Sequence, residues 1–75
     1  MQITLANLGP GQKGIIIQII GGRGMQSHLR TIGVREGKLV RIVTKQPARG
    51  PIVLEIDGNR IAMGRGMAMR VLVEI

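Results

Sequence analysis

Apolar residues occur along this chain in short blocks separated by glycine, and most of the blocks have the composition of β-strands. The strongest block covers residues 13–20 and contains five isoleucines, whose β-branched side chains suit a pleated surface. Because this block is apolar on both faces for most of its length, it predicts a central strand or one that curls across a barrel. Other blocks predict strands over residues 2–5, 38–45, 52–56, 60–63 and 70–75.

One segment departs from the strand pattern and predicts a helix from Met25 to Ile32. Its apolar side chains Met25, Leu29 and Ile32 recur at i, i+4 and i+7, which is the spacing of one helical face. Gly33 follows as a left-handed C-cap. A helix of about two turns is unstable alone, so it must dock on the strands through its apolar face. Arg30 would then point outward.

Turn signals separate the predicted strands. The Asp-Gly-Asn sequence at residues 57–59 predicts a hairpin, and residues 64–69 predict a bend with one turn of 3₁₀ helix. Five or six short strands with glycine-rich turns predict an all-β fold. We expect one domain over residues 1–75, a small closed or partly open barrel with one short inserted helix.

The charge of the chain directs attention to acidic partners. Lys and Arg total 11 against 4 Asp and Glu, which gives a net charge of +7. Such a charge favours a nucleic acid, an anionic membrane surface or an acidic protein face, although it also serves solubility alone. The chain has no Phe, Trp or Tyr, which excludes surfaces that stack bases on aromatic rings.

The sequence offers little material for a catalytic or tight metal site. It has no cysteine and a single histidine, His28, which we expect to be a partly buried helix residue. Ser27 is its immediate neighbour, so the two cannot form a catalytic triad. We therefore expect no enzymatic activity, no cofactor and no intrinsic metal site. The glycine run at residues 21–24 matches no phosphate-binding motif and is interpreted as a strand-to-helix connection.

We also expect a soluble cytoplasmic protein. No secretory signal is visible, and the longest apolar run, residues 15–20, is far shorter than the roughly 20 residues that span a bilayer. Five basic residues cluster between the glycine run, the helix and the following strand. They form either a patch for an acidic surface or a solvated face of the barrel: Arg23, Arg30, Arg35, Lys38 and Arg41.

Five collinear motifs carry a resemblance to a known family. They are Leu8-x-x-Gly11-x-x-Gly14-x-Ile16, Leu29-x-x-x-Gly33-Val34-x-x-Gly37, Pro47-x-x-Gly50-Pro51-Ile52, Ile61-Ala62 followed by Ala68, and Val71-x-Val73. Together they resemble FeoA, the ferrous iron transport protein A family, over essentially the whole chain.

The resemblance implies an SH3-like β-barrel with a short helix inserted between the early strands. It also implies cytoplasmic action on FeoB, a membrane ferrous iron transporter with a cytosolic GTPase domain. A similar domain forms the C-terminal module of repressors of the diphtheria toxin repressor type. The chain departs from the family pattern at residues 63–66, Met-Gly-Arg-Gly, where the family has Leu-Arg after its Ile-Ala segment. This difference leaves Arg65 without a role carried over from the family.

Two functional hypotheses follow. In the first, the protein docks on the cytosolic part of the FeoB transporter, which recruits it to the inner face of the membrane, and biases the transporter's conformation or nucleotide turnover. The expected partner-binding residues lie on the helix and its flanks: Arg23, Met25, Leu29, Arg30 and Arg35. In the alternative, a basic SH3-like barrel binds structured RNA or duplex nucleic acid through its backbone.

Overall fold

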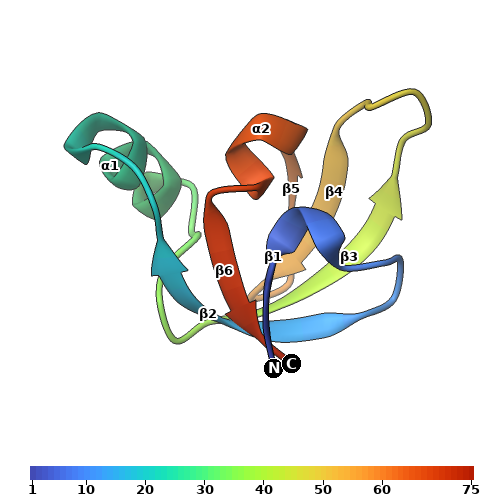
Figure 1. Cartoon of the computed structure of the whole chain (residues 1–75), viewed down its shortest axis with the longest axis horizontal. Helices are drawn as coiled ribbons and strands as arrows, with labels where there is room; N and C mark the ends of the chain where they lie inside the picture. The colour runs from blue at the N-terminus through green and yellow to red at the C-terminus, as the bar shows by residue number, and fades with distance from the viewer.

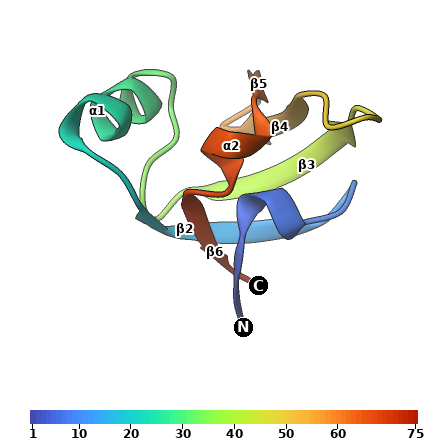
Figure 2. The same ribbon diagram turned by 45° about the horizontal axis from the view of Figure 1, so that its top comes forward.

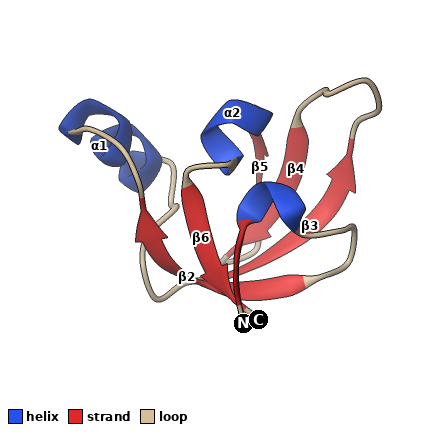
Figure 3. Cartoon of the chain, in the orientation of Figure 1, coloured by secondary structure: helices blue, strands red, loops and turns tan.

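A computed structural model describes residues 1–75. Six antiparallel strands form one curled sheet in the order β1-β6-β2-β3-β4-β5 (Figure 1, Figure 3). The strands are β1 (Gln2–Thr4), β2 (Lys13–Ile19), β3 (Leu39–Lys45), β4 (Ile52–Ile56), β5 (Asn59–Met63) and β6 (Val71–Glu74). The helices are α1 (Arg23–Thr31), α2 (Arg65–Ala68) and the 3₁₀ helix η1 (Leu5–Asn7).

The isoleucine-rich strand β2 lies in the middle of the sheet, between β6 and β3, as its two apolar faces predict. Both β2 and β3 contain an irregularity in their register. On β2 the pairing with β6 shifts between Ile16 and Gln18, and on β3 the pairing with β4 shifts between Ile42 and Thr44. Such bulges bend a strand and increase its twist, so they help the sheet to curl around its core.

The core consists of fifteen buried apolar side chains, and no polar or charged residue is buried. Alternation is clear in β4, where Ile52, Leu54 and Ile56 are buried and the two residues between them are half-buried. On β6, Val71 and Val73 point inward and Leu72 does not. With no aromatic residue available, the interior is filled almost wholly by aliphatic side chains.

The predicted inserted helix forms and ends as its sequence indicates. Gly33 has a φ of 101°, the left-handed conformation expected for a residue that follows a helix. The amide of Val34 donates to the carbonyl of Leu29 at 2.8 Å, and the amide of Gly33 donates to that of Arg30 at 3.1 Å. These two bonds are the Schellman arrangement, and its usual apolar contact pairs Leu29 with Val34, both fully buried.

Several details differ from the sequence predictions. The inserted helix begins at Arg23, two residues before the predicted Met25, and ends at Thr31. The first strand ends at Thr4, and Leu5 begins the helix η1. The bend at residues 64–69 contains one turn of α-helix, α2, rather than 3₁₀ helix. His28 is exposed, not partly buried. A nine-residue helix that docks through one narrow face leaves most of its circumference in solvent, and His28 lies on that part.

In the view of Figure 1, α1 and α2 both lie toward the top of the molecule, and both termini lie at the bottom. Turned by 45°, the molecule shows α1 standing to one side of the sheet, apart from α2 (Figure 2). Neither helix has the length and apolar character that a membrane crossing requires.

Candidate interaction surfaces

The five residues expected to bind a partner divide between the surface and the core. Arg23, at the start of α1, is exposed, as are Arg30 near its end and Arg35 in the turn after it. Met25 is half-buried. Leu29 has no exposed surface, so it cannot touch a partner and instead holds α1 on the barrel. We define the α1 surface as the four remaining residues, Arg23, Met25, Arg30 and Arg35.

Arg30 does not present a free charge. Its Nη2 lies 3.1 Å and 2.9 Å from the two carboxylate oxygens of Glu36, and its Nη1 lies 3.3 Å from Oε1 of Gln26. The pKa of Glu36 is lowered, first by a hydrogen bond from its own backbone amide and then by the Arg30 guanidinium. Arg23 and Arg35 form no ion pair, so they are the cations of the α1 surface that remain available to an acidic partner.

The other two residues of the predicted basic cluster point elsewhere. Lys38 Nζ lies 2.9 Å from Oδ2 of Asp57, and Arg41 Nη2 lies 2.9 Å from Oε1 of Glu55. Both partners belong to β4 and its following turn, so these two side chains extend over the outer face of the sheet. The predicted cluster is thus divided between the α1 surface and the sheet.

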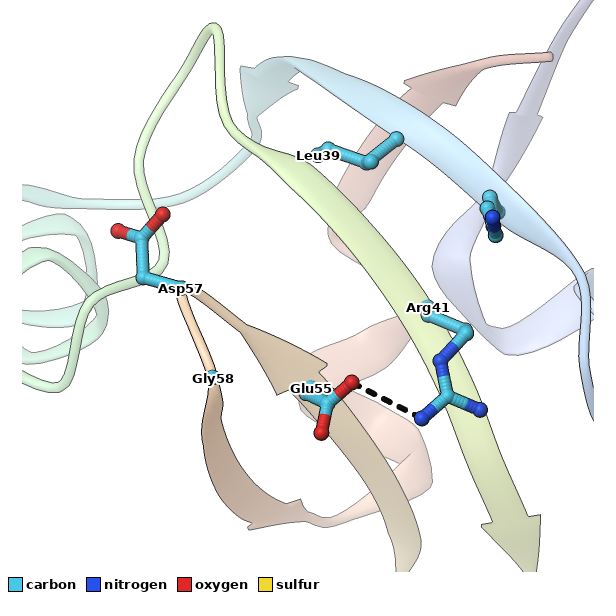
Figure 4. Close-up of a pocket in the computed structure, with 6 residues that line it drawn as sticks. Leu39, Arg41, Glu55, Asp57 and Gly58 are labelled. Atoms are coloured by element: carbon cyan, nitrogen blue, oxygen red, sulfur yellow. Dashed lines mark hydrogen bonds and ion pairs between the residues drawn. The ribbon is translucent and has the colours of Figure 1, made fainter.

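On the outer face, strands β2 to β4 border a hollow of about 360 Å³ (Figure 4). We call it the sheet-face hollow, and it is lined by Lys13, Leu39, Arg41, Glu55, Asp57 and Gly58. Figure 4 shows Arg41 extending from β3 toward Glu55 on β4, with Leu39 nearer the start of β3. The hollow therefore combines one apolar side chain with two cations and two carboxylates.

An exposed apolar pair adjoins the hollow. Leu39 is 53% exposed, and Ile15, its partner in the register between β2 and β3, is 40% exposed. Sequence reasoning missed this pair, although a signal exists. In β3, Val40 and Ile42 face inward, so strict alternation places Leu39 and Arg41 together on the outer face.

Each of the four Asp and Glu side chains has a cationic partner. Glu74 pairs with the amino group of Met1, and the other three carboxylates pair with Arg30, Lys38 and Arg41. Three of the eleven Lys and Arg residues are thus neutralised. The eight that have no carboxylate partner are Lys13, Arg23, Arg35, Lys45, Arg49, Arg60, Arg65 and Arg70.

The structure brings no three His, Cys, Asp or Glu side chains together in a group that could hold a metal ion. Only the first half of the glycine run connects β2 to α1, because Arg23 and Gly24 already belong to the helix. Nε2 of Gln26 donates to the carbonyl of Gly21 in this connection, at 2.9 Å. The α1 surface thus carries the unpaired cations Arg23 and Arg35, whereas the sheet-face hollow carries both cations and carboxylates.

The curled sheet of six strands with its inserted helix is an SH3-like barrel of the FeoA type. The FeoA domain model matches residues 3–75, so this chain belongs to the FeoA domain family. A Methanocaldococcus jannaschii protein, provisionally named Fe(2+) transport protein A, is 33% identical over 70 residues, which are 93% of this chain and 83% of that protein.

Solved structures agree with this assignment. The crystal structure of an iron uptake regulatory protein, FeoA, has a TM-score of 0.90 at 35% identity, covering 99% of this chain and 96% of the other. Iron(II) transport protein A from Clostridium thermocellum has a TM-score of 0.89 at 27% identity, covering 97% and 45%. A manganese-dependent transcriptional repressor shares the fold, with a TM-score of 0.89 at 20% identity, covering 97% of this chain and 41% of the repressor.

Proposed function

We propose that this protein is an accessory factor of ferrous iron uptake that docks on the cytosolic part of a FeoB-type transporter and modulates its activity. The observation that carries the proposal is the FeoA match across residues 3–75. The relative provisionally named Fe(2+) transport protein A supports it. On this proposal the protein works in the cytoplasm and reaches the inner face of the membrane through its partner.

The docking site in this proposal is the α1 surface. Arg23 and Arg35 form no ion pair there, and α1 stands to one side of the sheet, where a partner can approach it. Cations at the rim of an interface mainly accelerate association with an acidic face, and salt weakens their effect. To modulate transport, the docked protein must contact two states of the transporter with different free energies.

The experiment compares two matched charge reversals. Arg23→Glu changes the α1 surface, whereas Arg49→Glu makes the same change in the exposed loop between β3 and β4, at the opposite side of the molecule (Figure 1). Binding to the purified cytosolic domain of the FeoB-type transporter is measured by surface plasmon resonance at low and high salt. We expect Arg23→Glu to slow association by about tenfold at low salt and Arg49→Glu to leave it unchanged.

Arg30→Glu tests the same surface but is a less clean change. It would remove the pair with Glu36 and place two carboxylates side by side, which adds a local repulsion that has nothing to do with the partner. Arg35→Glu is the better second variant, since Arg35 donates only to the backbone carbonyl of Arg30, at 3.3 Å. If Arg23→Glu and Arg35→Glu both bind like the wild type, α1 is not the docking site.

A further inference from the structure

The strand β5 ends the sheet and has no neighbour on its outer side. The other edge strand, β1, has three residues, whereas β5 has five. The register between β4 and β5 continues without a shift from Ile52 and Met63 to Ile56 and Asn59. A regular edge of this length is a template on which another extended chain can pair.

The hairpin turn decides which backbone groups of β5 face outward. Asp57 and Gly58, with φ values of 53° and 79°, form the two-residue connection between Ile56 and Asn59. Such a turn is closed by a hydrogen-bonded pair, here Ile56 and Asn59, and bonded pairs alternate with unbonded ones along an antiparallel ladder. Arg60 therefore directs its N–H and C=O away from β4.

Ala62, two residues further along the strand, has the same orientation. Neither Arg60 nor Ala62 uses its backbone in any of the hydrogen bonds formed outside the helices and strands. Both residues are exposed. The edge thus offers two donors and two acceptors in the spacing that an added strand requires.

The features that usually block an edge are scarce on β5. The strand contains no proline and no bulge, and its single charge is that of Arg60. Arg60 lies opposite Glu55 in the register, but that carboxylate is bound to Arg41. Beyond the end of β5, Arg65 donates one hydrogen bond to the carbonyl of Gln46, at 3.3 Å, and its Nε has no partner.

The charge around the edge identifies the kind of chain that fits. We propose that β5 accepts an extended acidic segment of another protein as a seventh strand of the sheet. Its backbone would pair with Arg60 and Ala62, and its carboxylates would face the guanidinium of Arg60. Apolar side chains on its other face would cover Ile61, which is half-buried at the margin of the core.

A second copy of this chain fits the edge less well. Each copy carries a net charge of +7, so pairing two β5 strands would bring together two strongly cationic bodies. It would also place two Arg60 side chains on the same face of the joined sheet with no carboxylate between them. This inference concerns β5 and uses no residue of the α1 surface, so it stands whether or not α1 binds the transporter.

The probe is the capped peptide acetyl-Glu-Val-Glu-Val-Glu-Val-Glu-amide, with the same peptide carrying Lys in place of Glu as its control. Hydrogen exchange of the backbone amides is followed by NMR while each peptide is added at millimolar concentration. We expect the acidic peptide to slow exchange at Arg60 and Ala62 by about tenfold and the lysine peptide to have no effect. If the acidic peptide instead slowed exchange of backbone amides near basic residues over the whole surface, the proposal would be overturned.

Two protein variants separate backbone pairing from charge attraction. Ala62→Pro removes an outward N–H while leaving the ladder to β4 intact, because proline is tolerated at such edge positions. Ala62→Val keeps that N–H. We expect the acidic peptide to protect Arg60 in Ala62→Val and not in Ala62→Pro, and equal protection in both would overturn the proposal.

Arg60→Glu serves as an independent test if Ala62→Pro fails to fold. This variant should lose protection by the acidic peptide and gain it with the lysine peptide. In the wild-type protein without peptide, protection of the Ala62 amide that increases with protein concentration would show that a second copy pairs with the edge. That result would contradict the proposal.

Discussion

Arg41 and Glu55 face each other across β3 and β4, with Nη2 of the arginine 2.9 Å from Oε1 of the glutamate. The hydrogen bond from Arg41 is the main cause that lowers the pKa of Glu55, and the charge of the same guanidinium adds to it. We predict that Arg41→Gln returns the pKa of Glu55 toward the ordinary glutamate value. Titration of the side-chain carboxyl carbon by NMR measures the change, and an unaltered titration would contradict it.

The same pair predicts how stability depends on pH. A carboxyl group whose pKa is lowered by folding stabilises the native state above its unfolded pKa, and this contribution disappears as the pH falls through the folded pKa. Glu36 and Glu55 are both of this kind. We therefore expect the difference in Tm between the wild type and Arg41→Gln to shrink as the solution is acidified through the glutamate range. A difference that grows on acidification would show the opposite sign.

Leu29 anchors α1, so its truncation should cost far more than changes at the exposed side of the same helix. We expect Leu29→Ala to lower the free energy of unfolding by about 2–5 kcal/mol, because it removes a fully buried side chain and leaves a cavity. Arg30→Ala, one position further along, loses only a half-exposed ion pair and should cost less than about 1 kcal/mol. Urea denaturation of the two variants measures both values. Similar losses would mean that α1 is not held by Leu29.

Gly14 permits a close approach between β2 and β6. A Cβ atom at this position would lie 3.1 Å from Cβ of Val73 and 3.2 Å from the carbonyl oxygen of Glu74. We expect Gly14→Ala to destabilise the protein by about 1–3 kcal/mol through overpacking. In contrast, Gly24→Ala in the first turn of α1 meets nothing within 4 Å and should stabilise it by roughly 0.5–1 kcal/mol. Thermal unfolding distinguishes the two, and equal shifts in Tm would contradict the packing argument.

Much of the fold could be predicted because local chemistry determines it. The β-branched residues of β2 specify a strand, the Asp-Gly turn specifies the hairpin between β4 and β5, and Gly33 specifies the end of α1. Each of these signals acts over a few neighbouring residues. Tertiary contacts in the barrel favour the same elements, so the local signals predict the observed structure.

The surfaces could be predicted only in part because they depend on register. Whether Arg41 is free or paired depends on its position opposite Glu55, and that position is determined by the pairing of two strands separated by a loop. Leu29 shows a different limit. Its place on the apolar face of α1 was predicted, but a helix of nine residues needs that side chain for its own attachment, which removes it from the partner-binding set.

The two bulges change what a single-residue deletion would do. Along β2 the inward positions are even-numbered up to Ile16, and Ile19 faces inward after the extra residue Ile17. Because side chains alternate along a strand, deleting one residue normally turns every following side chain to the other face of the sheet. Loss of Ile17 would instead remove the extra residue of the bulge and leave Ile19 facing inward, whereas loss of Val53 in β4 would turn Leu54 and Ile56 to solvent. Relatives that are one residue shorter within β2 or β3 are thus expected to keep the same core.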